Sequence, residues 1–268
     1  MIPKCIHYCW FGGNELPRNV QMNIKSWHKY CPDYEIIEWN ENNFNIKENS
    51  YCWEAYKTKK WAFVSDYVRI YVLYNYGGIY LDTDVEMIRN MDIFLKYDSF
   101  WGIEGENEVG TGIIGSAAKK NVIKKILSSY ENSRFIKENG KCDFTTNVER
   151  ITKILKSYYN VDISNRIIEI DEGNVIFPHD FFSAKSLRTG KVEKTDRTYT
   201  IHHYNASWME QDDKEQLEAT KNYYNKLSNL KIMHIPNVIK YTLAKILAAY
   251  SRGGFGEIKK RVVARIKK

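Results

Sequence analysis

The chain has 268 residues, 43% of them hydrophobic, which is enough to bury one large core and excludes an intrinsically disordered protein. Its formal net charge of +7 is concentrated at one end, because residues 231–268 hold ten Lys or Arg and one acid, Glu257. The sequence has no apolar run of about 18 residues that could span a bilayer, and its first residues lack the apolar stretch of a secretory signal.

The five cysteines are scattered along the chain with no CxxC pair: Cys5, Cys9, Cys31, Cys52 and Cys142. On one extended strand Cys5 and Cys9 would lie roughly 13 Å apart, which is too far for a disulfide. This pattern favours a reducing compartment. We therefore expect a cytoplasmic protein that is neither secreted nor integral to the membrane.

The first elements alternate between strand and helix. Residues 2–10 read as a strand that ends at the turn residues 12–14, and Pro17 then begins a helix that continues to about Tyr30. A second strand is expected over residues 34–39. Because a strand, helix, strand order is typical of parallel sheets, the sequence predicts an α/β layer architecture.

A buried helix and an acidic strand follow. Residues 61–76 have apolar side chains on nearly every face, as a buried helix does, and Gly77 stands where a residue with positive φ would end it. The next strand carries Asp82 and Asp84 at its tip.

The rest of the chain continues the mixed pattern and then becomes helical. From residue 212 onward the pattern is helical, with glycines 253, 254 and 256 breaking the last helix from the one before it. We expect one domain over residues 1–230 and a basic amphipathic helical tail over residues 231–268. The remaining expected elements are strands around 100–103, 111–115, 167, 175 and 198–203, and helices from 119, over 145–158, from 236 and over 257–268.

Asp82 and Asp84 offer two hard oxygen donors on one edge of the sheet if the strand stays extended. Burying unpaired carboxylates costs several kcal/mol each or forces them to become neutral, so a pair in this setting calls for a cation. Oxygen ligands favour Mg²⁺ or Mn²⁺ over Zn²⁺. The alternative is a solvated turn at the end of a strand, where aspartate is common.

The preceding helix supplies a second polar pair. Asp66 and Arg69 are three residues apart and share one face of a helix that is otherwise made to be buried. One interpretation is an internal ion pair. Since a buried ion pair adds little stability, a polar ligand such as a sugar is a reasonable third partner.

The segment SDYVRIYVLYNYGGIYLDTDVE, residues 65–86, resembles the signature of family 32 glycosyltransferases, the DXD sugar-binding group. That group contains bacterial capsule and lipopolysaccharide enzymes and fungal mannosyltransferases, with clostridial glucosylating toxins as more distant relatives. Two further segments are similar to motifs of the family: IPKCIHYCWFGG at residues 2–13 and IHHYNASW at residues 201–208. The likeness therefore extends from residue 2 to about residue 208.

The resemblance implies a GT-A-like fold, a nucleotide-binding α/β sandwich with a central, mostly parallel sheet. It also implies that the DXD carboxylates hold a divalent metal against the diphosphate of a nucleotide sugar. Asp66, Arg69, Asp82 and Asp84 would then be the catalytic residues. Carried over by position, the donor-binding residues would be Tyr8, Trp10, Asp66, Arg69, Asp82, Ser207 and Trp208, and the metal-binding residues Asp82, Asp84, His202 and His203.

Several of these residues have a purely structural alternative. The resemblance implies that Trp10 stacks on the nucleobase, but a tryptophan at the end of a strand can also simply anchor the core. His202 and His203 are adjacent on a strand and point to opposite faces, so at most one is expected to bind the metal, with His202 favoured. Trp208 alone would be an ordinary core residue.

The reaction expected from the resemblance is metal-dependent transfer of a hexose or N-acetylhexosamine from a nucleotide sugar to a glycan acceptor, and the resemblance also implies retention of configuration. No separate carboxylate nucleophile stands out, which favours front-face attack with the leaving phosphate as base. A UDP-linked donor is favoured over GDP-mannose, and a lipid-linked acceptor in capsular polysaccharide or lipopolysaccharide biosynthesis is expected.

Two other functions remain open. One is a catalytically inactive, membrane-associated sugar-binding module. The other is a haloacid-dehalogenase-like phosphatase. The segment LDTDVE resembles the aspartyl-phosphate motif of those enzymes, although Glu86 stands where that motif needs Thr or Val. That motif also belongs to a first strand, whereas here about 75 residues precede it.

The acceptor site is not readable from the sequence. The glycine-rich residues 108–116 could let a sugar approach the backbone, or could only shape turns. Thr146 and Asn147 occupy the place where the family often carries a Gly-Pro pair.

The basic tail is amphipathic. Residues 237–250 place Val238, Leu243, Ile246 and Leu247 along one stripe with lysines beside it. Such helices lie on anionic membrane surfaces, so we expect a peripheral position on the inner face of the cell membrane as one interpretation and a helix packed on the catalytic domain as the other. The basic residues are not interleaved with stacking aromatics, which argues against nucleic acid.

Overall fold

The structure of the protein is a computed structural model that describes residues 1–268 except 106, 188, 206–208, 210, 230–235 and 267–268, and describes no side chains beyond residue 262. The chain divides into two compact units. The larger unit comprises Met1–Lys185 and Val192–Trp208, and the smaller one Ser186–Lys191 and Met209–Lys268. The predicted boundary at residue 230 lies outside the described residues and stays a prediction.

A seven-stranded sheet in the order β2-β1-β3-β6-β5-β8-β7 forms the centre of the larger unit. Five of its strands run in one direction, and β6 and β7 run against them. The predicted α/β fold with a mostly parallel sheet is therefore confirmed. The strands are β1 Cys5–Cys9, β2 Glu35–Trp39, β3 Gly78–Leu81, β5 Ser99–Glu104, β6 Glu108–Ser116, β7 Ile168–Asp171 and β8 Asn174–Phe177.

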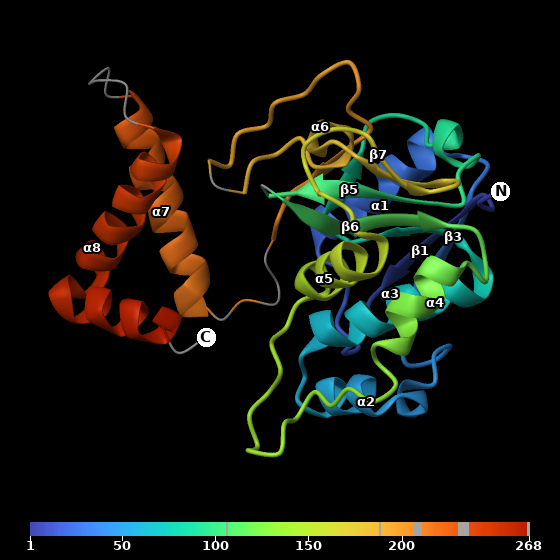
Figure 1. Ribbon diagram of the computed structural model, residues 1–268, viewed down its shortest axis with the longest axis horizontal. Helices are drawn as coiled ribbons and strands as arrows, with labels where there is room; N and C mark the ends of the chain where they lie inside the picture. The colour runs from blue at the N-terminus through green and yellow to red at the C-terminus, as the bar shows by residue number, and fades with distance from the viewer. Residues whose placement is uncertain (106, 188, 206–208, 210, 230–235, 267–268) are drawn as a thin grey trace. The chain divides into compact units, whose positions relative to one another are not determined.

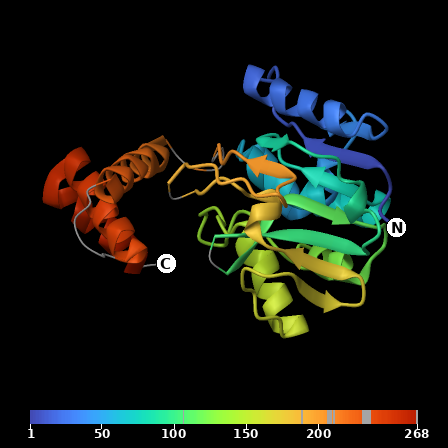
Figure 2. The same cartoon turned by 90° about the horizontal axis from the view of Figure 1, so that it is seen from above.

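Helices cover both faces of this sheet, which gives the layered, GT-A-like arrangement (Figures 1 and 2). Because side chains alternate along a strand, β1 sends Cys9 into the core beneath α3 and Tyr8 into the core beneath α1. The helices and 3₁₀ turns are α1 Arg18–Tyr30, η1 Ile46–Glu48, α2 Ser50–Lys57, α3 Trp61–Tyr76, η2 Asp92–Phe94, α4 Asn121–Ser128, α5 Asn147–Tyr159 and α6 His179–Phe182.

Helix α3 is buried, as its pattern predicts, with nine of its sixteen residues buried. It ends at Gly77, whose φ is 70° and whose N–H donates to Leu73 O at 3.0 Å. A Cβ at Gly77 would lie 2.8 Å from the backbone nitrogen of Ala118. Glycine is required here for its positive φ and for the close approach of the chain, so the predicted end of the helix is confirmed.

The acidic strand is shorter than the sequence predicts. Strand β3 ends at Leu81, and residues 82–84 turn, with Val85 N–H donating to Asp82 O at 3.0 Å. The chain then enters β4, Val85–Met87, which pairs antiparallel with β9, Thr200–His202. This second sheet places β9, which is distant in sequence, beside the turn that carries the two aspartates.

The smaller unit contains two helices, α7 Gln211–Asn229 and α8 Asn237–Ile266. Helix α8 is interrupted at Gly253 and Gly254, whose φ/ψ angles of −167°/23° and 62°/−151° are not helical, so the break predicted at these glycines is confirmed. Within the described residues, neither helix has a stretch long and apolar enough to cross a bilayer.

Candidate metal and donor site

The turn that carries the two aspartates is held on several sides. Asp82 N–H donates to Gly112 O of β6 at 2.8 Å. From α1, the side-chain amide of Asn23 donates to Thr83 O at 2.9 Å. The Trp27 indole N–H, also on α1, donates to Val85 O at 2.8 Å. These bonds fix the backbone of the turn at the carboxyl end of β3, the edge of α/β sheets where ligands bind.

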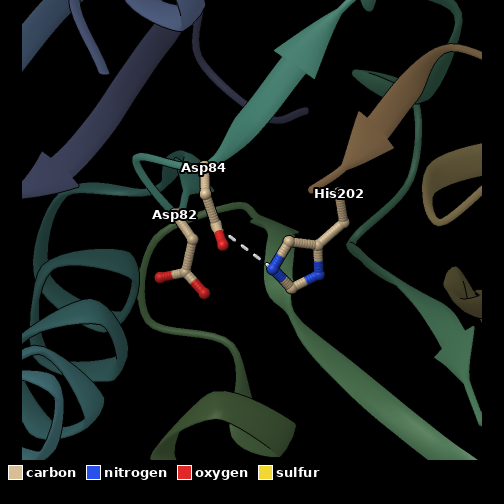
Figure 3. Close-up of side chains that lie close together, drawn as sticks. All are labelled: Asp82, Asp84 and His202. Carbon is tan, nitrogen blue, oxygen red and sulfur yellow. Dashed lines mark ion pairs between the residues drawn. The ribbon is translucent and has the colours of Figure 1, made fainter. Parts of the chain in front are cut away.

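Asp82, Asp84 and His202 converge at this edge (Figure 3). Each offers one ligand atom, and these atoms lie within 4.8 Å of one another. His202 Nε2 is 3.1 Å from Asp84 Oδ1. The two aspartates are partly buried and His202 is buried. The arrangement therefore supplies oxygen donors from the turn and one nitrogen donor from β9.

The ring of His202 is closely packed. A Cβ at Gly112 would lie 2.8 Å from His202 Cε1, so this glycine of β6 makes room for the ring. Two residues after β9 ends, the ring of Tyr204 lies 4.1 Å from the ring of His202, measured between centroids. Within the described residues, His202 Nδ1 is buried and has no hydrogen-bond partner.

Asp84 and His202 set each other's charge. Burial disfavours the Asp84 carboxylate, but His202 and the backbone N–H of Asn205, which donates to Asp84 Oδ2 at 2.7 Å, outweigh burial and lower the pKa of Asp84 to about 2. Burial likewise opposes a charge on His202, yet Asp84, Glu104 and Asp82 raise its pKa to about 9. Without another cation, the imidazolium balances this carboxylate.

Arg69 neutralises the other aspartate. Its Nη2 lies 3.0 Å from Asp66 Oδ1 and 3.1 Å from Asp82 Oδ1, and its Nη1 donates to Thr111 O at 2.7 Å. The Tyr80 hydroxyl donates to Asp82 Oδ1 at 3.0 Å. The Asp66 and Arg69 side chains are 12% and 5% exposed, and burial raises the pKa of Asp66 to about 6 despite Arg69. Asp66 and Arg69 thus share one face, as their spacing predicts, and Arg69 joins Asp66 to Asp82.

The donor set fits a divalent cation. Two carboxylates and one imidazole nitrogen converge, and a carboxylate-rich set with one histidine suits Mg²⁺ or Mn²⁺. Because a metal-bound imidazole must be neutral, a cation at Nε2 would replace the proton that Asp84 now stabilises there.

Five further residues were predicted for the site, and the side chains of the described ones make their contacts elsewhere. His203 Nε2 lies 3.0 Å from Glu86 Oε2, on the opposite side of β9 from His202. The Tyr8 hydroxyl donates to Glu38 at 2.7 Å, and Tyr8 packs in the core beneath α1. Trp10 is partly buried, and its indole N–H donates to Asn14 O at 2.6 Å. Ser207 and Trp208 lie outside the described residues.

Sequence reasoning missed several residues of the site. Tyr80 and Asn23 lie within ordinary strand and helix patterns, and Glu104 ends β5 without any motif. The glycines of 108–116 are strand residues of β6, not turns. Gly110 and Gly112 leave space for Glu104 and His202, and Gly115 for the ring of Phe100. Alternating glycines on one strand were the available signal, because they indicate side chains packed over its backbone.

Residues 17–101 match the family model described as "Glycosyltransferase sugar-binding region containing DXD motif". This segment includes Asp66, Arg69, Asp82 and Asp84, so the resemblance to the DXD glycosyltransferases is confirmed over it. The family model covers neither His202 nor the smaller unit.

Curated relatives agree with this match. Inositol phosphoceramide mannosyltransferase 3 of Schizosaccharomyces pombe is 32% identical over 120 residues, which is 43% of this chain and 33% of that protein. An uncharacterized glycosyltransferase of Acanthamoeba polyphaga mimivirus is 27% identical over 186 residues, 61% of this chain and 70% of that protein. The chain thus spans about a third of the length of the fungal relative.

Among solved structures, a glycosyltransferase involved in the glycosylation of the major capsid of PBCV-1 matches with a TM-score of 0.45 and 11% identity. The match covers 80% of this chain and 99% of that one.

Proposed function

We propose that this chain, which carries the DXD sugar-binding region of the glycosyltransferases, transfers a sugar from a nucleotide sugar to a glycan acceptor in a metal-dependent reaction. The observation that carries the proposal is the convergence of Asp82, Asp84 and His202 at the carboxyl edge of the sheet, beside the buried Asp66–Arg69 pair. A cation site next to a buried guanidinium suits a diphosphate joined to a sugar.

The chemistry divides between the cation and the chain. A bound divalent cation stabilises the negative charge that develops on the departing diphosphate. Asp84 and His202 would hold this cation, and Asp82 is oriented by Tyr80 and Arg69. Asp66 and Arg69 present an acceptor and a donor of hydrogen bonds to the hydroxyls of the sugar. The acceptor oxygen attacks from the face that the diphosphate leaves, and a diphosphate oxygen takes its proton, which retains the configuration.

The donor sugar is a hexose or N-acetylhexosamine, with UDP favoured over GDP as its carrier. The names of the fungal relatives describe mannosyl transfer, so GDP-mannose is kept as a second candidate donor. A thermal-shift panel of UDP- and GDP-sugars with Mn²⁺ decides between them, because a ligand that binds the native state raises the melting temperature. Stabilisation that needs both Mn²⁺ and one nucleotide sugar supports the proposal, and no stabilisation by any of them contradicts it.

An inactive sugar-binding module is the second candidate function. Hydrolysis of the stabilising nucleotide sugar with and without Mn²⁺ separates the two. An enzyme releases free sugar in the presence of Mn²⁺ and loses this activity in Asp84→Asn, whereas a binding module releases none. A covalent sugar adduct trapped on Asp66 would contradict the proposed front-face attack.

The acceptor is proposed to be lipid-linked, in the synthesis of a surface polysaccharide, with the second unit on an anionic membrane. Helix α8 buries Ala244 and Ala248, both 0% exposed, whereas Ile246 is 45% and Tyr250 51% exposed. A helix that buries alanines and exposes larger apolar side chains has a face suited to another apolar phase. The exposed apolar side chains of residues 237–250 are Val238, Ile239, Leu243, Ile246, Leu247 and Tyr250.

The charges of this helix favour an anionic surface. Arg252 and Arg261 pair with Asp212 of α7 at 2.6 and 2.7 Å. Lysines 240, 245, 259 and 260 add further positive charge along α8 against the single acid Glu257. Each basic residue near an anionic lipid surface adds about 1 kcal/mol of binding free energy.

Vesicle sedimentation tests the membrane proposal. The full chain should bind vesicles that contain phosphatidylglycerol more than vesicles of phosphatidylcholine alone, and high salt should weaken this binding. Ile246→Gln should reduce binding, whereas the matched change Ile93→Gln should not, because Ile93 is an isoleucine of the other unit that is 52% exposed. Equal binding by both variants would mean that α8 contacts something else, such as a second copy of the chain.

A further inference from the structure

The ring of His202 has one nitrogen without a partner in the part of the chain that the structure describes. Nε2 faces Asp84 at 3.1 Å, but Nδ1 is buried and makes no hydrogen bond to any of the described residues. A histidine that binds a metal almost always donates its other ring N–H to a carboxylate, a carbonyl or a water, which fixes the tautomer and the ring orientation. The site as described lacks this supporting acceptor.

Glu104 lies over the same strand as this ring. Gly110 and Gly112 are two residues apart on β6, so their open faces point to one side of the sheet. A Cβ at Gly110 would lie 3.1 Å from Glu104 Oε2, and a Cβ at Gly112 would lie 3.0 Å from His202 Nδ1. Gly110 and Gly112 are about 7 Å apart along the strand at its usual rise, so the carboxylate and the ring nitrogen lie over neighbouring positions of β6.

Glu104 also lacks a partner among the described residues. It is partly buried at the end of β5, opposite Glu108, and within the described part of the chain its carboxylate makes no hydrogen bond and no ion pair. The charged groups near it are His202, Asp82, Asp84 and Glu108, of which only His202 favours its ionised form. A carboxylate placed among three others costs stability, so a structural role alone does not account for it.

We propose that Glu104 is a positioning residue that accepts the Nδ1–H of His202, through one water molecule or after rotation of its side chain. This leaves Nε2 unprotonated and directed at the cation. The inference rests on the proposed function, because it assumes that the cation binds at Asp82, Asp84 and His202. It accounts together for two groups that are otherwise unpaired.

Binding of Mn²⁺ alone, followed by electron paramagnetic resonance, tests the proposal without any need for donor or acceptor. Glu104→Ala removes the acceptor and should weaken Mn²⁺ binding roughly ten- to a hundredfold, the usual effect of losing such a partner. Glu108→Ala is the matched control, since it removes the same side chain from the facing position of the same hairpin, where that side chain is exposed. It should change the affinity much less.

A second readout excludes a purely structural effect. In protein with ¹⁵N-labelled histidine and bound Mg²⁺, the Nδ1–H proton of His202 should be protected from exchange, and Glu104→Ala should remove this protection while the melting curve stays cooperative. Equal Mn²⁺ affinities for Glu104→Ala and Glu108→Ala would overturn the inference and leave the proposed function standing. Failure of the unaltered chain to bind Mn²⁺ would overturn both.

Discussion

In the larger unit the side chain of Arg69 is 5% exposed and lies between two carboxylates, whereas in the smaller unit Ile246 is 45% exposed and Ala248 is fully buried. Burying these charged groups costs the larger unit stability, and the smaller unit leaves apolar side chains exposed to water. Neither arrangement is what folding alone favours. The comparison supports the two proposed surfaces: a polar site for an ionic ligand, and a helix face for an apolar one.

The largest effect is expected at the cation site. Asp84→Asn removes a ligand charge and should reduce hydrolysis of the nucleotide sugar by roughly a thousandfold, because a bound cation supplies several kcal/mol to the transition state. Initial rates at saturating Mn²⁺ measure this. Asp98→Asn, which changes a surface carboxylate 37% exposed beside Lys120, is the control and should have little effect. A rate for Asp84→Asn near that of the control contradicts the assignment.

Loss of Arg69 should have the next largest effect, on stability. Arg69→Met leaves Asp66 and Asp82 without their cation, which should lower the free energy of unfolding by about 3–5 kcal/mol. Arg252→Met in α8 removes a guanidinium whose acidic partners Asp212 and Glu215 are each 54% exposed, and should cost less than about 1 kcal/mol. Urea unfolding of both variants measures the contrast. Similar losses would mean that the two units do not differ in this way.

The two histidines should differ in metal binding. His202→Ala removes the ring beside Asp84 and should weaken Mn²⁺ binding by one to two orders of magnitude. His203→Ala breaks only the contact with Glu86 and should leave the Mn²⁺ affinity nearly unchanged. Titration calorimetry with Mn²⁺ distinguishes them, and the opposite order of losses would assign the ligand to His203.

The pH dependence follows from the same ring. The pKa of His202 is raised in the folded, metal-free protein to about 9, so its pairing with Asp84 stabilises the fold fully below about pH 6.5 and is lost as pH rises through 9. Mn²⁺ must displace the proton, so its affinity should rise up to about tenfold per unit between pH 7 and 9. Melting temperatures at several pH values, with and without Mn²⁺, should therefore move in opposite directions. An affinity that falls over this range contradicts the account.

The smallest effect concerns α8. Ile246→Gln changes a residue that is 45% exposed and should alter the free energy of unfolding by no more than about 0.5 kcal/mol. Ala248→Leu places a larger side chain in the closed contact with α7 and should cost about 1–3 kcal/mol. Thermal unfolding of the two variants gives the comparison. A large loss in Ile246→Gln alone would show that this face is covered in solution.

Much of the fold could be predicted because its signals are local. Apolar periodicity and turn residues indicate β1, α1, α3 and the break at Gly253, and each depends on neighbours in sequence. Helix α2 has no clear signal, because its apolar residues are mixed with polar ones that also pack, such as Glu54. The end of β3 at Leu81 was also missed, because the bonds that turn the chain there come from β6 and α1.

Only those site residues that belong to a short sequence motif could be predicted from the sequence. Asp82 and Asp84 lie two residues apart, so spacing alone associates them. The choice of His202 over His203 depends on the pairing of β9 with β4, a contact between residues more than a hundred positions apart. Glu104 became visible only when the register of β5 and β6 placed it beside Gly110.

The most direct test of the central claim is the location of the cation. Crystals grown with Mn²⁺ and UDP and measured at the manganese absorption edge give its position independently of the protein model. The account predicts one strong anomalous peak about 2.0–2.6 Å from Asp84 and His202, the distance at which such ligands bind divalent cations. A peak elsewhere, or bound nucleotide with no manganese beside these residues, would contradict it.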